Sequence, residues 1–100
     1  MIAAIFWFVW AMAEVHLTSH LRNIVAGGPF AAAGATVGEA LADVLNAQPQ
    51  LRSYVLDDQG GLRKHVCIFA DGVRLNHAAA LDHRIGPQTK LHVMQALSGG

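Results

Sequence analysis

A single segment of this chain has the period of a surface helix, and it lies between segments that alternate with the two-residue period of strands. The helix is predicted to begin at Thr36, which forms a capping box with Glu39, so that each side chain satisfies a free backbone N–H group. Asn46 and Pro49 predict its end. Its apolar stripe consists of Val37, Leu41, Val44 and Leu45. One amphipathic helix among strands favours a sheet with the helix packed across one face.

Two strands are predicted before the helix. Strict alternation from Glu14 to Leu21 is typical of a half-buried strand, whose inward residues would be Val15, Leu17, Ser19 and Leu21. The sequence Gly27-Gly28-Pro29 predicts a loop. The segment from Phe30 to Ala33 is expected to return as a weak second strand and close a hairpin.

Three strands are predicted after the helix: His65 to Ala70, Val73 to Leu75 and Leu91 to Gln95. The dipeptide Asp71-Gly72 predicts a tight hairpin between the first two, because both residues tolerate positive φ. The inward residues of these strands would be Val66, Ile68, Ala70, Leu91 and Val93.

The connections between these elements have their own signals. Asp57 to Gly61 and Gly86-Pro87 predict turns, and Ala78 to Ile85 predicts a short helical turn or an irregular crossing. Four residues after the helix are expected to pack just beyond it: Leu51, Tyr54, Val55 and Leu56.

The element order is therefore strand, strand, helix, strand, strand, strand. The fold class predicted from it is α+β, a β-grasp (ubiquitin-like) arrangement with a mixed sheet of four to five strands and one main helix across it. The first and last strands would be central neighbours. The chain divides into an apolar extension (1–13), the β-grasp domain (14–95) and a flexible tail (96–100) that ends in Gly-Gly.

Composition limits the function. The 7 basic and 7 acidic residues give a net charge of zero, so the chain lacks the basic surface that nucleic acid requires, and no membrane partner is expected either. A single cysteine excludes a disulfide framework and a cysteine-rich zinc site. A domain of 100 residues also has little room for an enclosed active-site cleft.

The first 13 residues contain no charge and are too short for a membrane-spanning helix, which needs about 20 residues. Three interpretations stay open. The segment is a signal or anchor, since Ala11-Met12-Ala13 fits a small-x-small cleavage site but no basic residue precedes the apolar run. Alternatively, translation starts at Met12, or the segment is a structured extension.

Gly99 and Gly100 end the sequence. Because glycine has no Cβ, an extended tail that ends in two glycines can enter a narrow channel and present the Gly100 carboxylate to an enzyme. The alternative is a frayed end without a role.

The sequence from Val15 to Gly100 resembles the ThiS/MoaD family of ubiquitin-like sulfur carriers. The resemblance includes the helix Thr-Val-Gly-Glu-Ala-Leu-Ala-Asp-Val-Leu (36–45), the strand and turn His-Val-Cys-Ile-Phe-Ala-Asp-Gly (65–72) and the ending Gln-Ala-Leu-Ser-Gly-Gly (95–100). The layout is most similar to CysO-like carriers of cysteine or secondary-metabolite pathways. Two departures concern the subfamily: Gln95 replaces a frequent proline, and Gly86-Pro-Gln-Thr89 replaces an acidic turn.

The resemblance implies a cytoplasmic carrier that is not itself an enzyme and binds no cofactor. A MoeB/ThiF-like adenylating enzyme would use ATP and Mg²⁺ to form an acyl-adenylate on Gly100. A sulfur donor (sulfide, a rhodanese or a cysteine desulfurase) would then convert it to a thiocarboxylate for a sulfur-accepting biosynthetic enzyme. Leu97, Ser98 and Gly99 would line the passage of the tail into these partners.

Three alternatives remain open: the small subunit of molybdopterin synthase, a protein modifier conjugated through Gly100, and a binding module with an inert tail. The sulfur acceptor also stays open among cysteine, thiamine, molybdopterin, a tRNA base and a specialised metabolite.

The other reactive side chains favour ordinary surface or core roles. Cys67 with His65 on the same strand face suggests a nucleophile, but a mid-strand cysteine is more often a small buried hydrophobe. His16 and His20 have helical ligand spacing, but on a strand they would lie about 13 Å apart, too far to chelate one ion. Solvated side chains are therefore expected for these two and for His77, His83 and His92, and no metal site is predicted. A solvated face, or a docking patch, is expected for Arg52, Arg63, Lys64, Arg74, Arg84 and Lys90.

Overall fold

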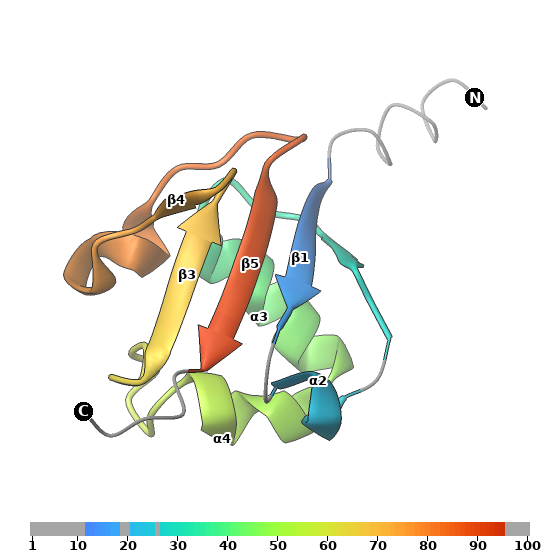
Figure 1. The fold of residues 1–100 in the computed structure, drawn as a ribbon, viewed down its shortest axis with the longest axis vertical. Coiled ribbons are helices and arrows are strands. Elements are labelled where there is room, and N and C mark those ends of the chain that lie inside the picture. Colours follow the sequence, from blue (N-terminus) through green and yellow to red (C-terminus); the bar gives the residue numbers. More distant parts are fainter. Residues whose placement is uncertain (1–11, 19–20, 26, 96–100) are drawn as a thin grey trace.

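The computed structural model describes residues 12–18, 21–25 and 27–95. Within them, a five-stranded sheet has the order β2-β1-β5-β3-β4 and is covered on one face by a helix (Figure 1). The strands are β1 (Ala13–Leu17), β2 (Phe30–Ala32), β3 (Val66–Ala70), β4 (Val73–Arg74) and β5 (Lys90–Gln95). The predicted β-grasp arrangement is confirmed.

The two central strands, β1 and β5, run parallel, and all other pairs are antiparallel. In the central pair Val15 lies beside Leu91 and Leu17 beside Val93, and all four side chains point toward the helix layer. The first and last strands of the domain are thus neighbours, as predicted.

The main helix, α3 (Val37–Ala47), begins as the capping box predicts. The Glu39 N–H donates to Thr36 Oγ1 (3.2 Å), and the Ala35 N–H donates to Glu39 Oε1 (2.8 Å). At the other end, the Gln48 N–H donates to the Val44 carbonyl (2.8 Å), and Pro49 follows. These bonds satisfy backbone groups that a helix terminus otherwise leaves free.

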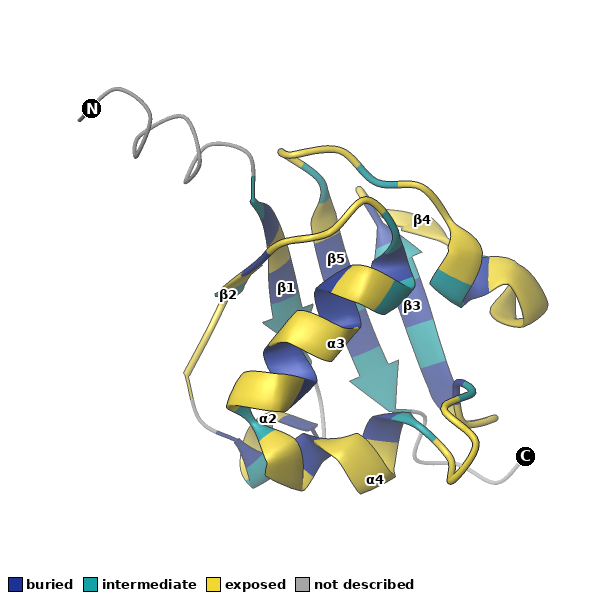
Figure 2. Ribbon diagram, turned by 180° about the vertical axis from the view of Figure 1, so that it is seen from behind, coloured by how far each residue is buried: buried dark blue, intermediate teal, exposed yellow. Residues whose placement is uncertain are grey.

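The core lies between α3 and the sheet, and Figure 2 marks the buried residues of these elements in dark blue. The buried residues among those described are all apolar. Every second residue of β1 and β3 is buried, as are Leu91 and Val93 of β5, which is the pattern expected of a sheet with one covered face. The helix contributes Val37, Ala40, Leu41, Val44 and Leu45.

Short helical turns close the two ends of this core. η1 (Pro49–Leu51) and α4 (Arg52–Val55) continue from α3 and bury Leu51 and Val55. Leu56 is half-buried, but Tyr54 is 39% exposed, so its predicted packing is wrong. The crossing before β5 contains η2 (His77–Asp82), in agreement with the short helical turn predicted there.

The first strand is shorter than predicted. It ends at Leu17, and Leu21 begins the short helix α2 (Leu21–Ile24), where it is fully buried. Alternation misled the prediction because Leu21 would be buried in either arrangement; the predicted inward position of Ser19 lies outside the described residues. β4 is also shorter, ending at Arg74, although the Leu75 N–H still donates to the Ile68 carbonyl (2.9 Å).

The hairpin between β3 and β4 turns at Asp71 and Gly72, which have φ angles of 49° and 86°. Two consecutive positive φ angles define the tight turn that matches the twist of paired strands. The turn is held to β5, because the Asp71 side chain accepts from the Lys90 backbone N–H (2.9 Å) and the Asp71 N–H donates to the Lys90 carbonyl (2.9 Å).

Candidate functional site

The candidate site is the end of β5, because this central strand leads into the Gly-Gly tail. Its last residue, Gln95, pairs with Val66 at the start of β3. Leu97, Ser98, Gly99 and Gly100 lie outside the described residues, as does the extension before Met12. The structure therefore describes the base of the tail rather than the tail itself.

Gln95 itself has one atypical feature. Its side-chain Oε1 is buried and has no hydrogen-bond partner among the described residues. A buried acceptor without a partner costs about 1–3 kcal/mol. Gln95, which replaces a proline frequent in the resembled family, thus also contains a buried acceptor atom without a hydrogen bond.

The sheet face opposite α3 contains a shallow apolar depression beside the end of β5. It has a volume of about 230 Å³ and is lined by Thr18, Phe69, Gly72, His92 and Met94. The four larger side chains are half-buried. We refer to these five residues as the open-face depression. The depression extends along β5 from the β3–β4 turn at Gly72 to Met94, the residue before Gln95.

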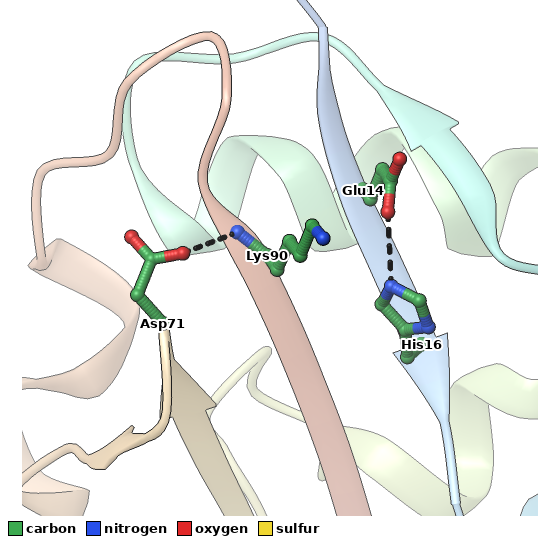
Figure 3. A network of polar contacts seen from close by, with 4 residues as sticks. All are labelled: Glu14, His16, Asp71 and Lys90. Atoms are coloured by element: carbon green, nitrogen blue, oxygen red, sulfur yellow. Dashed lines mark hydrogen bonds and ion pairs between the residues drawn. The ribbon is translucent and has the colours of Figure 1, made fainter.

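Two histidines stack on this face, a contact that the sequence analysis missed. His16 of β1 and His92 of β5 occupy the same register position, and their rings lie 4.6 Å apart at an interplanar angle of 13°. His16 Nε2 lies 3.1 Å from Glu14 Oε1, and Glu14 and Lys90 are themselves register partners (Figure 3). Both residues are half-buried, and the His16 side chain is 28% exposed, so the predicted solvated histidines are at the surface but partly covered by each other.

The parallel register explains the contact. Residues of one parity on β1 and β5 share a face, so a histidine at the same step of each strand places the rings side by side. The sequence predicted that these two strands are neighbours. Pairing the two histidines required, in addition, the register between the strands.

The remaining histidines are exposed: His65, His77 and His83. His77 Nε2 forms a 2.9 Å hydrogen bond with the Arg63 carbonyl. His20 lies outside the described residues. Within residues 12–18, 21–25 and 27–95, no three His, Cys, Asp or Glu side chains come close enough together to hold a metal ion.

The polar neighbour of Cys67 is Arg74 rather than His65, the residue considered as its partner in a nucleophile. Cys67 is half-buried within β3, whereas His65 precedes the strand and is exposed. The Sγ atom of Cys67 instead contacts Arg74, whose Nη2 lies 3.2 Å away. The geometry therefore provides no pairing of Cys67 with His65 of the kind a thiol–imidazole nucleophile requires.

The basic side chains predicted to form a solvated face are all exposed, but two of them have partners within the fold. Arg74 contacts Cys67, and Arg63 Nε donates to the carbonyls of Ser53 (2.6 Å) and Leu56 (3.1 Å). Arg63 thereby joins α4 to the Asp57–Gly61 turn.

That turn is built around Asp57. Its Oδ1 accepts from the backbone N–H groups of Gly61 and Gln59, both at 2.9 Å. These two hydrogen bonds, that from Gly61 first, stabilise the carboxylate and lower the pKa of Asp57 below its ordinary value. The nearby Arg63 adds to the effect.

Comparison with solved structures identifies the architecture. SAMP1 from Haloferax volcanii is similar at 26% identity, over 89% of this chain and 99% of that one, with a TM-score of 0.77. The small archaeal modifier protein 1 from Methanosarcina acetivorans matches at 23% identity, over 90% and 97%, with a TM-score of 0.76. CysO in the Amycolatopsis orientalis BexX/CysO complex matches at 20% identity, over 88% and 99%, with a TM-score of 0.74.

This chain has the fold of the ThiS/MoaD-like ubiquitin-fold proteins. The similarity predicted from the sequence is confirmed by these structures, which belong to carriers and modifiers rather than to enzymes. No protein-family model matches the sequence. No curated protein matches it either. In the described part of the chain, no helix is long and apolar enough to cross a bilayer.

Proposed function

We propose that this ThiS/MoaD-like chain is a sulfur carrier whose Gly100 carboxylate is activated by adenylation and converted to a thiocarboxylate. The observation that supports this most is a ubiquitin-like fold, shared with CysO and SAMP1, whose central strand continues into Gly99-Gly100. The chain would supply the carboxylate and a docking surface, and a partner enzyme would supply the catalysis.

The chemistry explains why activation is needed. A carboxylate is a poor electrophile, because its leaving group would be oxide. Reaction with ATP forms an acyl-adenylate and releases pyrophosphate, after which sulfide attacks the carbonyl carbon and AMP departs. The product is a thiocarboxylate, whose sulfur is a nucleophile at neutral pH. The need for ATP is the reason to propose a cytoplasmic location.

The length of the tail determines where the activating enzyme must bind. Gly100 is the fifth residue after Gln95, and a chain of five residues extends at most about 17 Å. An active site that receives Gly100 therefore lies close to the end of β5. The open-face depression reaches Met94, one residue before this end, and we propose that a MoeB/ThiF-like enzyme docks there.

The first test is adenylation. With ATP, Mg²⁺ and a MoeB/ThiF-like enzyme, we expect the full chain to stimulate ATP–pyrophosphate exchange. Deletion of Gly99-Gly100 should abolish the stimulation while leaving the fold unchanged. A deletion variant that stimulates exchange as well as the full chain would contradict the proposal.

A second candidate function is conjugation to other proteins through Gly100. It is favoured by the similarity to the two small archaeal modifier proteins, which share 26% and 23% identity with this chain, against 20% for CysO. A modifier would also be adenylated, so the two functions differ only after that step. Conjugates of higher mass in cell extracts, absent after deletion of Gly99-Gly100, would favour the modifier.

A further inference from the structure

A second cavity, of about 290 Å³, lies beside the outer edge of β1. β2 pairs with β1 only as far as Val15, which lies opposite Phe30. Beyond that pair, the space next to β1 is bordered by the Gly27–Pro29 loop and by α2 rather than by a strand. The cavity lining includes His16, Thr18, Arg22, Gly27, Gly28 and His92.

The ionisable side chains of this lining are all bases: His16, Arg22 and His92. Arg22 is exposed and has no carboxylate within ion-pair distance in the described part of the chain. His92 has a ring neighbour but no hydrogen-bond partner among the described residues. His16 is the exception, since one of its nitrogens already contacts Glu14, which does not line the cavity. Arg22 and His92 therefore line the cavity without an ion-pair or hydrogen-bond partner among the described residues.

We propose that this cavity binds a small oxyanion, a tetrahedral sulfate or phosphate group or a planar carboxylate. The Arg22 guanidinium presents several N–H donors in a plane that matches such groups. An imidazole N–H of His92 would supply a further donor, and the space beside Gly27 is open, since an added Cβ there would meet no atom within 4 Å. A volume at the lower limit of ligand pockets suits a small anionic group rather than a large molecule.

The test is a ¹H–¹⁵N NMR titration of the full chain with sodium sulfate, with ionic strength held constant by sodium chloride. We expect saturable shifts concentrated at Thr18, Gly27 and Gly28, and a Kd in the millimolar range, which is about 4 kcal/mol or less of binding. A parallel titration with acetate distinguishes a site for tetrahedral anions from one that accepts carboxylates equally.

Three variants at two arginines make the test specific. Arg22→Gln should raise the sulfate Kd by about fivefold, the effect of losing one exposed charge-assisted contact. Arg52→Gln, at an exposed arginine of α4, should leave the Kd unchanged. Arg22→Lys, which keeps the charge but loses the planar donors, should lie between the wild type and Arg22→Gln.

Several results would overturn the proposal. These are shifts that do not saturate, shifts that chloride reproduces, or an equal Kd for the wild type and Arg22→Gln. Arg22 is exposed, and the same spectra show whether its variants keep the fold. Because the titration uses the chain alone, its failure would leave the proposed chemistry at Gly100 unaffected.

Discussion

His16 and His92 stack at the same register position of the two central parallel strands, with ring centroids 4.6 Å apart. The pair lies where the open-face depression meets the polar cavity beside β1, and His92 lines both. The His92 side chain therefore forms part of both the proposed docking surface and the proposed oxyanion site.

This stack should contribute measurably to stability. We expect His92→Ala to lower the free energy of unfolding by about 1 kcal/mol, the contribution typical of a half-buried aromatic contact. His92→Phe keeps a ring against His16 and should recover most of the loss. Urea unfolding measures both, and equal losses for the two variants would show that the stacked ring contributes nothing.

A pH-dependent contribution should come from Asp57, whose pKa is lowered by the Gly61 and Gln59 N–H groups. A carboxyl group with a lower pKa in the folded state stabilises the fold above its unfolded pKa of about 3.9. The contribution disappears as pH falls through the folded pKa. Asp57→Asn should therefore be less stable than the wild type at pH 7, and the gap should close toward pH 2.

Asp58→Asn is the matched control, because Asp58 is a neighbouring exposed carboxyl group whose side chain forms no hydrogen bond within the described residues. Urea midpoints at several pH values give the comparison. A gap between wild type and Asp57→Asn that stays constant with pH would contradict the assignment to the charged carboxylate.

The atoms around Gly34 leave no space for a side chain at this position. Its φ is +152°, and an added Cβ would lie 2.7 Å from the Glu39 Cβ and 2.8 Å from the Ala40 nitrogen. Gly34→Ala should destabilise the fold by about 1–3 kcal/mol. Gly60 has a φ of +84° and open space around it, so Gly60→Ala would introduce backbone strain but no steric clash. Its loss of stability should therefore be smaller. Equal thermal midpoints for the two variants would contradict this.

The open-face depression should matter for activation but little for folding. Phe69→Ser should reduce the efficiency of adenylation by about tenfold, the loss typical of an apolar residue central to an interface. Tyr54→Ser changes an exposed aromatic residue on α4 and should have little effect. The measurement is the kcat/KM of ATP–pyrophosphate exchange as the concentration of each variant is raised. Equal values for both variants would place the docking surface elsewhere.

Much of the fold was predictable because sequence pattern and burial agree. The capping box at Thr36 and Glu39 and the positive-φ turn at Asp71-Gly72 are local features, and both are confirmed. Alternation identified the buried faces of β3 and β5 because the helix covers only one side of the sheet.

The features that could not be predicted depend on contacts between distant segments. Leu21 is buried in a helical turn rather than in the first strand, and alternation cannot separate these cases. The stack of His16 on His92 depends on strand register, and the cavity at Arg22 depends on how the Gly27–Pro29 loop crosses the edge of β1. The residues proposed for the tail lie outside the described residues, so their roles stay predictions.

A local change in the tail should separate activation from folding. Gly99→Ala adds one methyl group where the tail is proposed to enter a narrow channel, so we expect normal thermal unfolding and poor activation. Ser98→Ala is the control for a small change next to it. Equal activation rates for Gly99→Ala and the wild type would exclude a role for Gly99 in passage.

The central claim is tested most directly by the intact mass of the chain after incubation with ATP, Mg²⁺, a sulfide source and an active MoeB/ThiF-like enzyme. The account predicts a mass gain that corresponds to one oxygen replaced by sulfur, located by fragmentation at Gly100. An unchanged mass, with an enzyme that demonstrably forms the adenylate on this chain, would contradict the sulfur-carrier function.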